Sequence, residues 1–457
     1  MFGKLRRVHF VGIGGVGMSG IALLLHNLGF EVSGSDIKES DITRHLAEFG
    51  VGIRIGHAAE NCQGADVLVY SSAVSRDNPE LLAAAMQRIP VIPRAEMLAE
   101  LMRMKFSIAV SGTHGKTTVT SLIGAVLEQA GLDPTTVIGG RILGTEAGAR
   151  LGRSEYLVAE ADESDRSFLL LYPSLAVITN IEREHLDVYR SLNEIKRAFV
   201  EFANRVPFYG TVIAGIDSDA VRRIFAKFQR KKTSYGRRRD ADVRASRIEL
   251  EPFKSSFLLS LRGKEVGRFQ LNLGGIHNVE NALAVLAVAL ELGVDLEVCA
   301  RVFATFSGVH RRLELVGNRN GITVMDDYGH HPTEICVTLQ TLRQAFPERR
   351  IVVVFQPHRY TRTKLLAREF GPAFRSADVL LMLPVYAASE PPIPGVSSQL
   401  IEEQVRLTMG QEFPIVPISD HDEAVSWLCA NLKPQDIVIT QGAGNIWEIG
   451  RSFLNRR

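Results

Sequence analysis

Short apolar runs alternate with longer amphipathic stretches along most of this chain. The runs span four to six residues, and most of them end in a glycine-rich or polar turn. They lie at residues 8–11, 31–34, 65–70, 106–110, 156–159, 175–179, 322–325, 350–355, 379–383 and 437–440. Helical patterns follow several of them, at 18–28, 79–87 and 94–104. Alternation of this kind predicts an α/β fold built on parallel sheets, with ligands at the carboxyl ends of the strands.

The length of the chain predicts more than one domain. At 457 residues it is too long for one ordinary hydrophobic core, and roughly 150 residues per domain predicts about three. A strand begins at Phe106, directly after the helix over 94–104, which puts the first boundary near Lys105. A polar junction at Arg312 precedes the strand that begins at Ile322. We therefore expect domains at 1–104, 105–312 and 313–457.

Residues 112–118, with the sequence GTHGKTT, form the most informative segment. An apolar strand precedes them and an apolar helix follows, which is the context of a phosphate-binding loop. Glycines let backbone N–H groups converge on phosphate oxygens, Lys116 can reach the β- and γ-phosphates, and the Thr117 hydroxyl can ligate Mg²⁺. The loop is two residues shorter between its glycines than the usual GxxxxGK[ST] motif. A plain surface turn is the alternative, and the two flanking elements argue against it.

A second glycine loop follows the first strand. Gly12, Gly14 and Gly17 have the spacing GxGxxG, and Asp36 lies about twenty residues further on, as in a dinucleotide site. Taken alone, the loop fits NAD and a UDP-sugar equally, and Asp36 could bind a ribose or only cap the turn. The loop at 112–118 favours the UDP-sugar, because a simple dehydrogenase has no use for a second phosphate loop.

Acidic residues follow two apolar strands of the middle segment. The strand at 156–159 ends in Glu160 and further carboxylates, and the strand at 175–179 precedes a polar run that includes His185. Carboxylate oxygens suit Mg²⁺, and we expect both strand ends at the edge of the sheet that carries the phosphate loop. A solvated charge run and a structural histidine are the alternatives.

Polar residues at two other positions have a structural and a functional interpretation. Ser71, Ser72 and Asn78 follow a strand and fit turn chemistry and ligand binding equally well. Asn278 opens an alanine-rich helix, where capping explains it. Asn281 lies one turn further on, where a nucleotide contact becomes reasonable.

The last third of the chain adds histidines and arginines. Arg312 could reach the γ-phosphate when the domains close, or it could be a surface charge. His330 and His331 are adjacent, which suggests a metal, but the proline and helix after them place both along a strand-to-helix turn rather than around one ion. Arg359 and Arg362 follow an apolar strand and suit a carboxylate through forked hydrogen bonds.

Composition limits the classes of protein that remain. A hydrophobic fraction of 46% with 23% charged residues is typical of a globular protein, and a net charge of +2 gives no pull toward nucleic acid. The basic residues at 230–239 flank a Tyr-Gly turn and favour a solvated loop over a binding patch. The four cysteines lack CxxC spacing, which fits reduced cytosolic thiols, and the glycines at 12–20 argue against a secretion signal.

Six ordered motifs give a resemblance that covers essentially the whole chain. They lie at residues 12–20, 112–118, 160–165, 277–281, 327–332 and 358–362. Together they resemble the Mur ligases, which build the peptide stem of peptidoglycan. The resemblance implies a Rossmann-like first domain for the UDP-sugar, a central P-loop ATPase-type domain for Mg-ATP, and a Rossmann-like α/β third domain that helps to bind ATP and receives the amino acid.

The resemblance also implies substrates and site residues. The lactyl carboxylate of UDP-N-acetylmuramate would attack the γ-phosphate of ATP to give an acyl phosphate, and the amine of L-alanine would then displace phosphate. The catalytic residues would be Lys116, Glu160, His185 and Asp327, and Mg²⁺ would be held by Thr117, Glu160 and His185. ATP would contact Gly112, Thr113, His114, Gly115, Lys116, Thr117, Thr118, Asn278, Asn281 and Arg312. The other substrates would contact Gly14, Gly15, Val16, Gly17, Asp36, Ser71, Ser72, His114, Tyr328, His330, Arg359 and Arg362.

We expect a cytoplasmic enzyme that is a monomer or weak homodimer, without a nucleic-acid or membrane partner. Three other functions remain open. A nicotinamide-dependent oxidoreductase would leave Lys116 and the acidic strand ends unused, and a regulatory ATPase would leave Arg359 and Arg362 unused. Within the family, the nearest rival is a ligase that recycles a whole tripeptide onto the same sugar.

Overall fold

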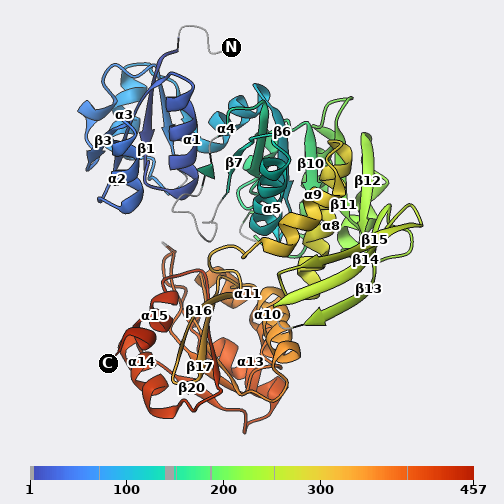
Figure 1. Ribbon diagram of the computed structural model, residues 1–457. Coiled ribbons are helices and arrows are strands. Elements are labelled where there is room, and N and C mark those ends of the chain that lie inside the picture. The colour runs from blue at the N-terminus through green and yellow to red at the C-terminus, as the bar shows by residue number, and fades with distance from the viewer. Residues whose placement is uncertain are drawn as a thin grey trace.

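The structure is a computed structural model that describes residues 5–71, 73–138, 149–150, 152–185, 188–251, 253–388 and 390–456. Within these residues the chain forms three sheets, which have five, ten and six strands in sequence order. Figure 1 shows three bodies, the first in blue, the second from teal to yellow, and the third in orange and red, each with helices packed against its sheet. The predicted three-domain α/β architecture is confirmed.

The first domain is a parallel sheet with the strand order β3-β2-β1-β4-β5. Its strands are β1 (Arg7–Val11), β2 (Glu31–Asp36), β3 (Gly52–Ile55), β4 (Val67–Tyr70) and β5 (Val91–Pro93). Its helices are α1 (Val16–Asn27), α2 (Asp41–Glu48), the 3₁₀ helix η1 (Ala59–Cys62), α3 (Pro79–Met86) and α4 (Arg94–Arg103). Since β1 lies between β2 and β4, the winding direction reverses there, and the glycine loop after β1 occupies this switch point.

The second domain has the strand order β15-β14-β13-β12-β11-β10-β6-β9-β7-β8. Its strands are β6 (Phe106–Ser111), β7 (Thr135–Val137), β8 (Ala149–Arg150), β9 (Tyr156–Glu160), β10 (Leu175–Ile178), β11 (Thr211–Gly215), β12 (Lys231–Gly236), β13 (Val243–Glu251), β14 (Lys254–Leu261) and β15 (Lys264–Leu271). Its helices are α5 (Lys116–Gln129), the 3₁₀ helix η2 (Ser167–Leu170), α6 (Leu192–Asn204), α7 (Asp219–Phe225), α8 (Ile276–Glu291) and α9 (Leu296–Thr305). β6 pairs in parallel with β9 on one side and β10 on the other, so the polar ends of both strands flank the phosphate loop.

The third domain has the strand order β16-β17-β21-β18-β19-β20. Its strands are β16 (Glu314–Arg319), β17 (Ile322–Asp327), β18 (Ile351–Phe355), β19 (Val379–Met382), β20 (Ile415–Pro417) and β21 (Ile437–Gln441). Its helices are α10 (Pro332–Ala345), α11 (Tyr360–Leu365), α12 (Ala367–Ala373), α13 (Gln399–Met409), α14 (His421–Asn431) and α15 (Trp447–Asn455). Figure 1 shows α10 and α11 on the side of this domain that faces the second domain.

The continuous apolar runs are explained by burial on both faces of the sheets. In β18, Ile351, Val353 and Phe355 pack into one core cluster, whereas Val352 and Val354 pack into another on the opposite face. Strands covered on both sides need no alternation with polar residues. Among the described residues, no helix is long and apolar enough to span a membrane.

The sequence did not predict the antiparallel strands. β13, β14 and β15 pair in an antiparallel manner at one edge of the second sheet, and β16 pairs with β17 in the same way. β14 places buried residues mostly at alternate positions, with more exposed ones between them. A strand of this kind has no unbroken apolar run, so a search for such runs misses it.

The interpretation of residues 230–239 as a solvated loop is wrong for their central part. Lys231–Gly236 form β12, which pairs in parallel with β11, and Tyr235 is buried within the second core. The strand can contain the charged Lys232, because its ammonium donates hydrogen bonds to the backbone carbonyls of Phe225 and Phe228. The charges that indicated a loop therefore belong to a strand with bonded lysine side chains.

Candidate active site

The phosphate loop has the predicted strand–loop–helix form, with β6 before it and α5 after it. Gly115 is the N-cap of α5 and has a φ of +84°, and an added Cβ would lie 2.5 Å from the side-chain oxygen of Asn281. Glycine is therefore required here both by conformation and by space. No side chain caps α5, and its first turn contains no acidic residue, so its free N–H groups can receive an anion.

Lys116 is held in place by the loop itself and by an acid. Its Nζ donates to Gly112 O at 2.6 Å, to Thr113 O at 3.2 Å and to Glu163 Oε1 at 3.0 Å. Burial favours the neutral amine, but Glu163 and Asp162 outweigh this effect and raise the pKa of Lys116. Burial also raises the pKa of Glu163 to about 7, although Lys116 lowers it. The structure thus supplies a fixed cation within the loop that the sequence predicts to bind phosphate.

The expected metal residues lie around this cation. Thr117 is in the first turn of α5, Glu160 ends β9, and His185 lies in the loop that follows β10. The Nε2 of His185 is 3.7 Å from Glu163 Oε1, and burial lowers the pKa of His185, so its ring keeps a free lone pair at neutral pH. Metal binding by these three residues stays a prediction.

A cavity of about 700 Å³ extends from the phosphate loop to the third domain. This volume suits a ligand of nucleotide size. Residues predicted for ATP binding or catalysis line it from four separate segments, and these are His114, Gly115, Thr117, Thr118, Asn278, Asn281, Arg312 and Asp327. Among the lining residues that were not predicted are Asp217, Tyr235, Arg237 and Glu280.

The beginning of α8 differs from the sequence interpretation. Asn278 does not cap the helix, because the N-cap is Gly275, whose φ is +94°. Instead, Asn278 Nδ2 donates to Gly274 O at 2.8 Å, and Asn278 Oδ1 accepts a bond from Asn281 Nδ2 at 3.1 Å. The two asparagines thus form one bonded pair that faces the cavity, so the capping interpretation of Asn278 is wrong.

Arg312 stands at the junction of the second and third domains. Its Nη1 lies 3.6 Å from Glu334 Oε1. Burial would lower its pKa, but Glu334, Asp327 and Glu160 outweigh burial and raise it. Because these carboxylates come from both domains, Arg312 makes an electrostatic contact between the domains with a side chain that is 33% exposed.

The predicted amino-acid residues meet the second domain at Glu184. Arg362 Nη2 donates to Glu184 Oε1 at 3.0 Å, and His330 Nε2 lies 3.7 Å from the same oxygen. Tyr328 packs edge-on against His330 with ring centroids 5.5 Å apart. Arg359 and Arg362 both line a small second cavity beside Glu184. The guanidinium of Arg362 thus already binds a carboxylate of the protein, and its role toward L-alanine stays a prediction.

The glycine loop of the first domain is supported by Asp36. The N–H of Gly14 donates to Asp36 Oδ2 at 2.8 Å, and the N–H of Ile37 donates to Asp36 Oδ1 at 2.8 Å. The structure therefore shows the turn-capping role of Asp36, while a ribose contact remains a prediction. Gly17 lies against the guanidinium of Arg94, which adds a cation to the loop.

The remaining positions in the first domain are partly structural. Asn78 caps α3 by accepting the N–H of Glu80, so its turn interpretation is correct. Ser71 accepts a long bond of 3.4 Å from the N–H of Ala73 at the end of β4. Ser72 lies outside the described residues.

Comparison with known proteins places this geometry in one family. The chain matches the Mur ligase family catalytic domain at 7–106, the Mur ligase middle domain at 110–289, and the Mur ligase glutamate ligase domain at 311–444. It is 52% identical to the UDP-N-acetylmuramate–L-alanine ligase of Geobacter sp. strain M21, over 100% of this chain and 98% of that one. The chain belongs to the Mur ligase family.

Other ligases are also similar to this chain along nearly its whole length. The UDP-N-acetylmuramate–L-alanine ligase of Trichlorobacter lovleyi is 51% identical, with 100% of both chains covered. The crystal structure of the UDP-N-acetylmuramate-alanine ligase from Thermotoga maritima has a TM-score of 0.83 and 29% identity, and 98% of each chain is covered. A murein peptide ligase from Psychrobacter arcticus has a TM-score of 0.72 and 25% identity, also over 98% of each chain. The resemblance predicted from the six motifs is confirmed.

Two carboxylates of this Mur ligase were missed by the sequence prediction, namely Glu163 and Glu184. Glu163 lies in the same acidic run as Glu160, and Glu184 directly precedes His185. Both side chains are buried and pair with predicted site cations, Lys116 and Arg362. The available signal was their place in the two acidic strand ends, but sequence alone does not show which acid of a run points inward.

Proposed function

We propose that this chain is an ATP-dependent ligase that joins L-alanine to UDP-N-acetylmuramate. The observation that carries the proposal is the full-length identity of 52% and 51% with relatives that bear this activity in their names. A Mur ligase of this kind uses both glycine loops, whereas a nicotinamide oxidoreductase would leave the Lys116 loop unused.

The proposed reaction forms an amide bond in two steps. An oxygen of the lactyl carboxylate attacks the γ-phosphorus of ATP, and the bond from that phosphorus to the β-phosphate oxygen breaks. The products of this step are an acyl phosphate and ADP. The amine of L-alanine then attacks the acyl carbon, a proton is lost from nitrogen, and inorganic phosphate leaves. Lys116 would offset charge on the transferred phosphoryl group, Arg312 would contact the nucleotide from the domain junction, and Asp327 would contact it from the third domain.

The residues present fit ATP and Mg²⁺. The uncapped first turn of α5 offers N–H donors to phosphate, and the adjoining cavity of about 700 Å³ can hold a nucleotide. Thr117, Glu160 and His185 would hold Mg²⁺, supported by the position of their segments on either side of β6. When bound, Mg²⁺ supplies positive charge to the β- and γ-phosphate oxygens. A neutral His185 ring and a carboxylate are suitable ligands, although Mg²⁺ generally prefers oxygen.

The other substrates are assigned to the first and third domains. The glycine loop Gly14–Gly17, with Asp36 behind it, would hold the UDP diphosphate. Tyr328, His330, Arg359 and Arg362 would face L-alanine, with one arginine binding its carboxylate. We also propose a cytoplasmic location, which the free cysteines support, and a monomer or weak homodimer, which sedimentation velocity tests.

The test is ADP release with UDP-N-acetylmuramate and a panel of acceptors. We expect turnover with L-alanine, less with glycine or L-serine, and essentially none with the tripeptide L-alanyl-γ-D-glutamyl-meso-diaminopimelate. The tripeptide arm is needed because murein peptide ligases share this fold at 25% and 30% identity. Preference for the tripeptide would assign the recycling activity instead, and tight NADH binding without acceptor-dependent ADP release would refute the ligase.

A further inference from the structure

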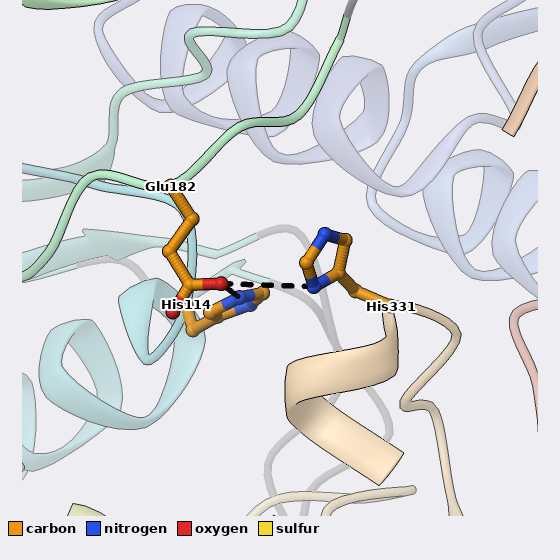
Figure 2. A group of neighbouring side chains, drawn as sticks. All are labelled: His114, Glu182 and His331. Carbon is orange, nitrogen blue, oxygen red and sulfur yellow. Dashed lines mark ion pairs between the residues drawn. The ribbon is translucent and has the colours of Figure 1, made fainter. Parts of the chain in front are cut away.

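Two histidines and a glutamate from different domains meet at one point, and we call them the junction cluster. His114 lies in the phosphate loop, Glu182 lies in the segment after β10, and His331 is the N-cap of α10. Figure 2 shows the Glu182 carboxylate facing both imidazole rings. Within the described part of the chain, this is the one group of at least three His, Cys, Asp or Glu residues whose ligand atoms all lie within 4.8 Å of one another.

The separations in the junction cluster approach those around a single metal ion. Glu182 Oε2 lies 3.5 Å from His114 Nε2 and 3.8 Å from His331 Nδ1. Tetrahedral ligands with bonds of about 2.0–2.1 Å are about 3.3 Å apart. The two distances to Glu182 exceed that value by only a few tenths of an ångström, and the two histidine nitrogens lie within 4.8 Å of each other, so side-chain rotations would bring the three atoms onto one ion.

The surroundings of the ligand atoms match the outer shell of known metal sites. His114 Nδ1 bonds Glu334 Oε1 at 3.1 Å, which leaves Nε2 directed at Glu182. A carboxylate on the second nitrogen of a histidine is the usual support of a metal ligand. Thr333 Oγ1 donates to Glu182 Oε2 at 2.6 Å and so orients the third ligand. Two residues of α10 thus hold the ligands that the second domain contributes.

The junction cluster is also incompletely bonded as it stands. Among the described residues, the proposed ligand atom His114 Nε2 is buried without a hydrogen-bond partner. His331 is 5% exposed, and its Nδ1 accepts only a long bond of 3.3 Å from the N–H of Thr333. Buried polar atoms without partners are uncommon, and an unoccupied ion site is one cause of them.

We propose that His114, Glu182 and His331 bind a divalent transition-metal ion of the Zn²⁺ type. Two imidazole nitrogens and one carboxylate oxygen favour Zn²⁺ or Co²⁺ over Mg²⁺, which prefers oxygen ligands. Three protein ligands leave a fourth position for water. The site shares no residue with Thr117, Glu160 and His185, but it shares His114 with the proposed ATP and substrate contacts, and His114 and Glu182 line the proposed nucleotide cavity.

The consequence of occupancy is a link between two domains. The ion would tie the phosphate loop of the second domain to the first turn of α10 in the third. Ligation uses the lone pair of His114 Nε2, so a proton held there is released on binding. Because the ion binds the folded, closed arrangement, it should raise the midpoint of thermal unfolding.

The test is a Zn²⁺ titration of the full nucleotide-free chain against a chromophoric chelator. The wild type should bind one tight equivalent, and His331→Ala and Glu182→Gln should each weaken it at least ~100-fold, since even outer-shell changes cost 10–100-fold. Thr333→Val, which keeps all three ligands, should weaken it ~10-fold. His330→Ala is the matched control, because it removes the neighbouring histidine of the same turn and should leave the affinity unchanged.

Two further readouts keep the result unambiguous. Co²⁺ at the site should give the intense visible bands of four-coordination, and these should vanish in His331→Ala while the circular dichroism of the chain stays unchanged. Zn²⁺ should raise the unfolding midpoint of the wild type and of the His330→Ala control, but not that of His331→Ala or Glu182→Gln. The proposal is overturned if the wild type binds no tight equivalent, if His331→Ala binds Zn²⁺ as well as the wild type, or if His185→Ala rather than His331→Ala removes the bound ion.

Discussion

Replacing Lys116 by alanine removes a charge that the protein fixes before the nucleotide binds. The ammonium is bonded to two loop carbonyls and to Glu163, and its side chain is only 19% exposed. A preorganised charge of this kind contributes ~100- to 1,000-fold in rate, or about 3–4 kcal/mol of transition-state stabilisation. We therefore expect the Lys116→Ala variant to lose at least 100-fold in the rate of ADP release.

The same variant leaves the buried carboxyl of Glu163 without its cation. Removing one member of a buried ion pair costs about 3–5 kcal/mol when the other stays charged. Glu163 has a pKa of about 7 even beside Lys116, so without the cation it takes up a proton at neutral pH. The remaining cost is that of a buried polar group with a lost bond, about 1–3 kcal/mol. Adding Glu163→Gln to Lys116→Ala should therefore cause little further loss in urea unfolding.

Calorimetry with UDP-N-acetylmuramate tests whether the Lys116→Ala substitution affects only the loop at 112–118 or also the binding of the sugar. Binding of the sugar should be nearly unchanged in Lys116→Ala, because the two glycine loops belong to different domains. Lys105→Ala is a suitable control, since Lys105 precedes the same strand β6 at its opposite end and bonds Ser154 O. Equal weakening of sugar binding and of ADP release in Lys116→Ala would refute the assignment of the two loops.

Three other expectations follow from the described contacts. His185→Ala or Glu160→Ala should raise the Mg²⁺ concentration needed for half-maximal activity, and an unchanged Mg²⁺ titration of either variant would make that residue structural. Replacing Arg359 or Arg362 by alanine or lysine should raise the KM for L-alanine far more than that for ATP, with less effect on the weaker acceptor L-alaninamide; an equal loss with both acceptors would assign these arginines to the fold or the nucleotide. Burial alone would raise the pKa of Glu80, but hydrogen bonds with His9, Asn61 and Ser35 outweigh it and lower the pKa from 4.5 to about 2. The ionised Glu80 therefore contributes about 3 kcal/mol to the free energy of unfolding above pH 4.5, and this contribution is lost as the pH falls through 2. Urea unfolding of Glu80→Gln, followed by circular dichroism, should show that loss at pH 7 and a flatter acid limb, and an unchanged acid limb would contradict it.

The fold was predictable where burial leaves a simple trace in the sequence. The parallel strands β10 and β18 are apolar throughout, and β1 and β6 are mainly apolar, because helices cover both faces of their sheets. The antiparallel strands β13–β16 have a mixed pattern and were missed. β12 was misjudged for another reason, since its two lysines are bonded to neighbouring segments rather than free in a loop: Lys231 bonds Glu291, and Lys232 bonds carbonyls of Phe225 and Phe228.

The candidate site was predictable where its residues are contiguous. The phosphate loop 112–118 carries its own signal, because the glycines, the lysine and the threonine must be adjacent in sequence. Contacts between domains leave no such signal, so neither the pairing of Arg362 with Glu184 nor the meeting of His114 with His331 could be predicted. In the proposed site the ion lies between His331 and His114, not between the adjacent His330 and His331.

The most direct test of the proposed ligation follows an oxygen atom of the sugar carboxylate. UDP-N-acetylmuramate labelled with ¹⁸O at both lactyl carboxylate oxygens is turned over with ATP and L-alanine, and the products are analysed by mass spectrometry. An acyl phosphate intermediate passes one carboxylate oxygen to phosphate and leaves the other in the new amide. We predict that each released inorganic phosphate carries one labelled oxygen. Unlabelled phosphate released together with the amide product, with the lost oxygen found in the nucleotide or in water, would contradict the account.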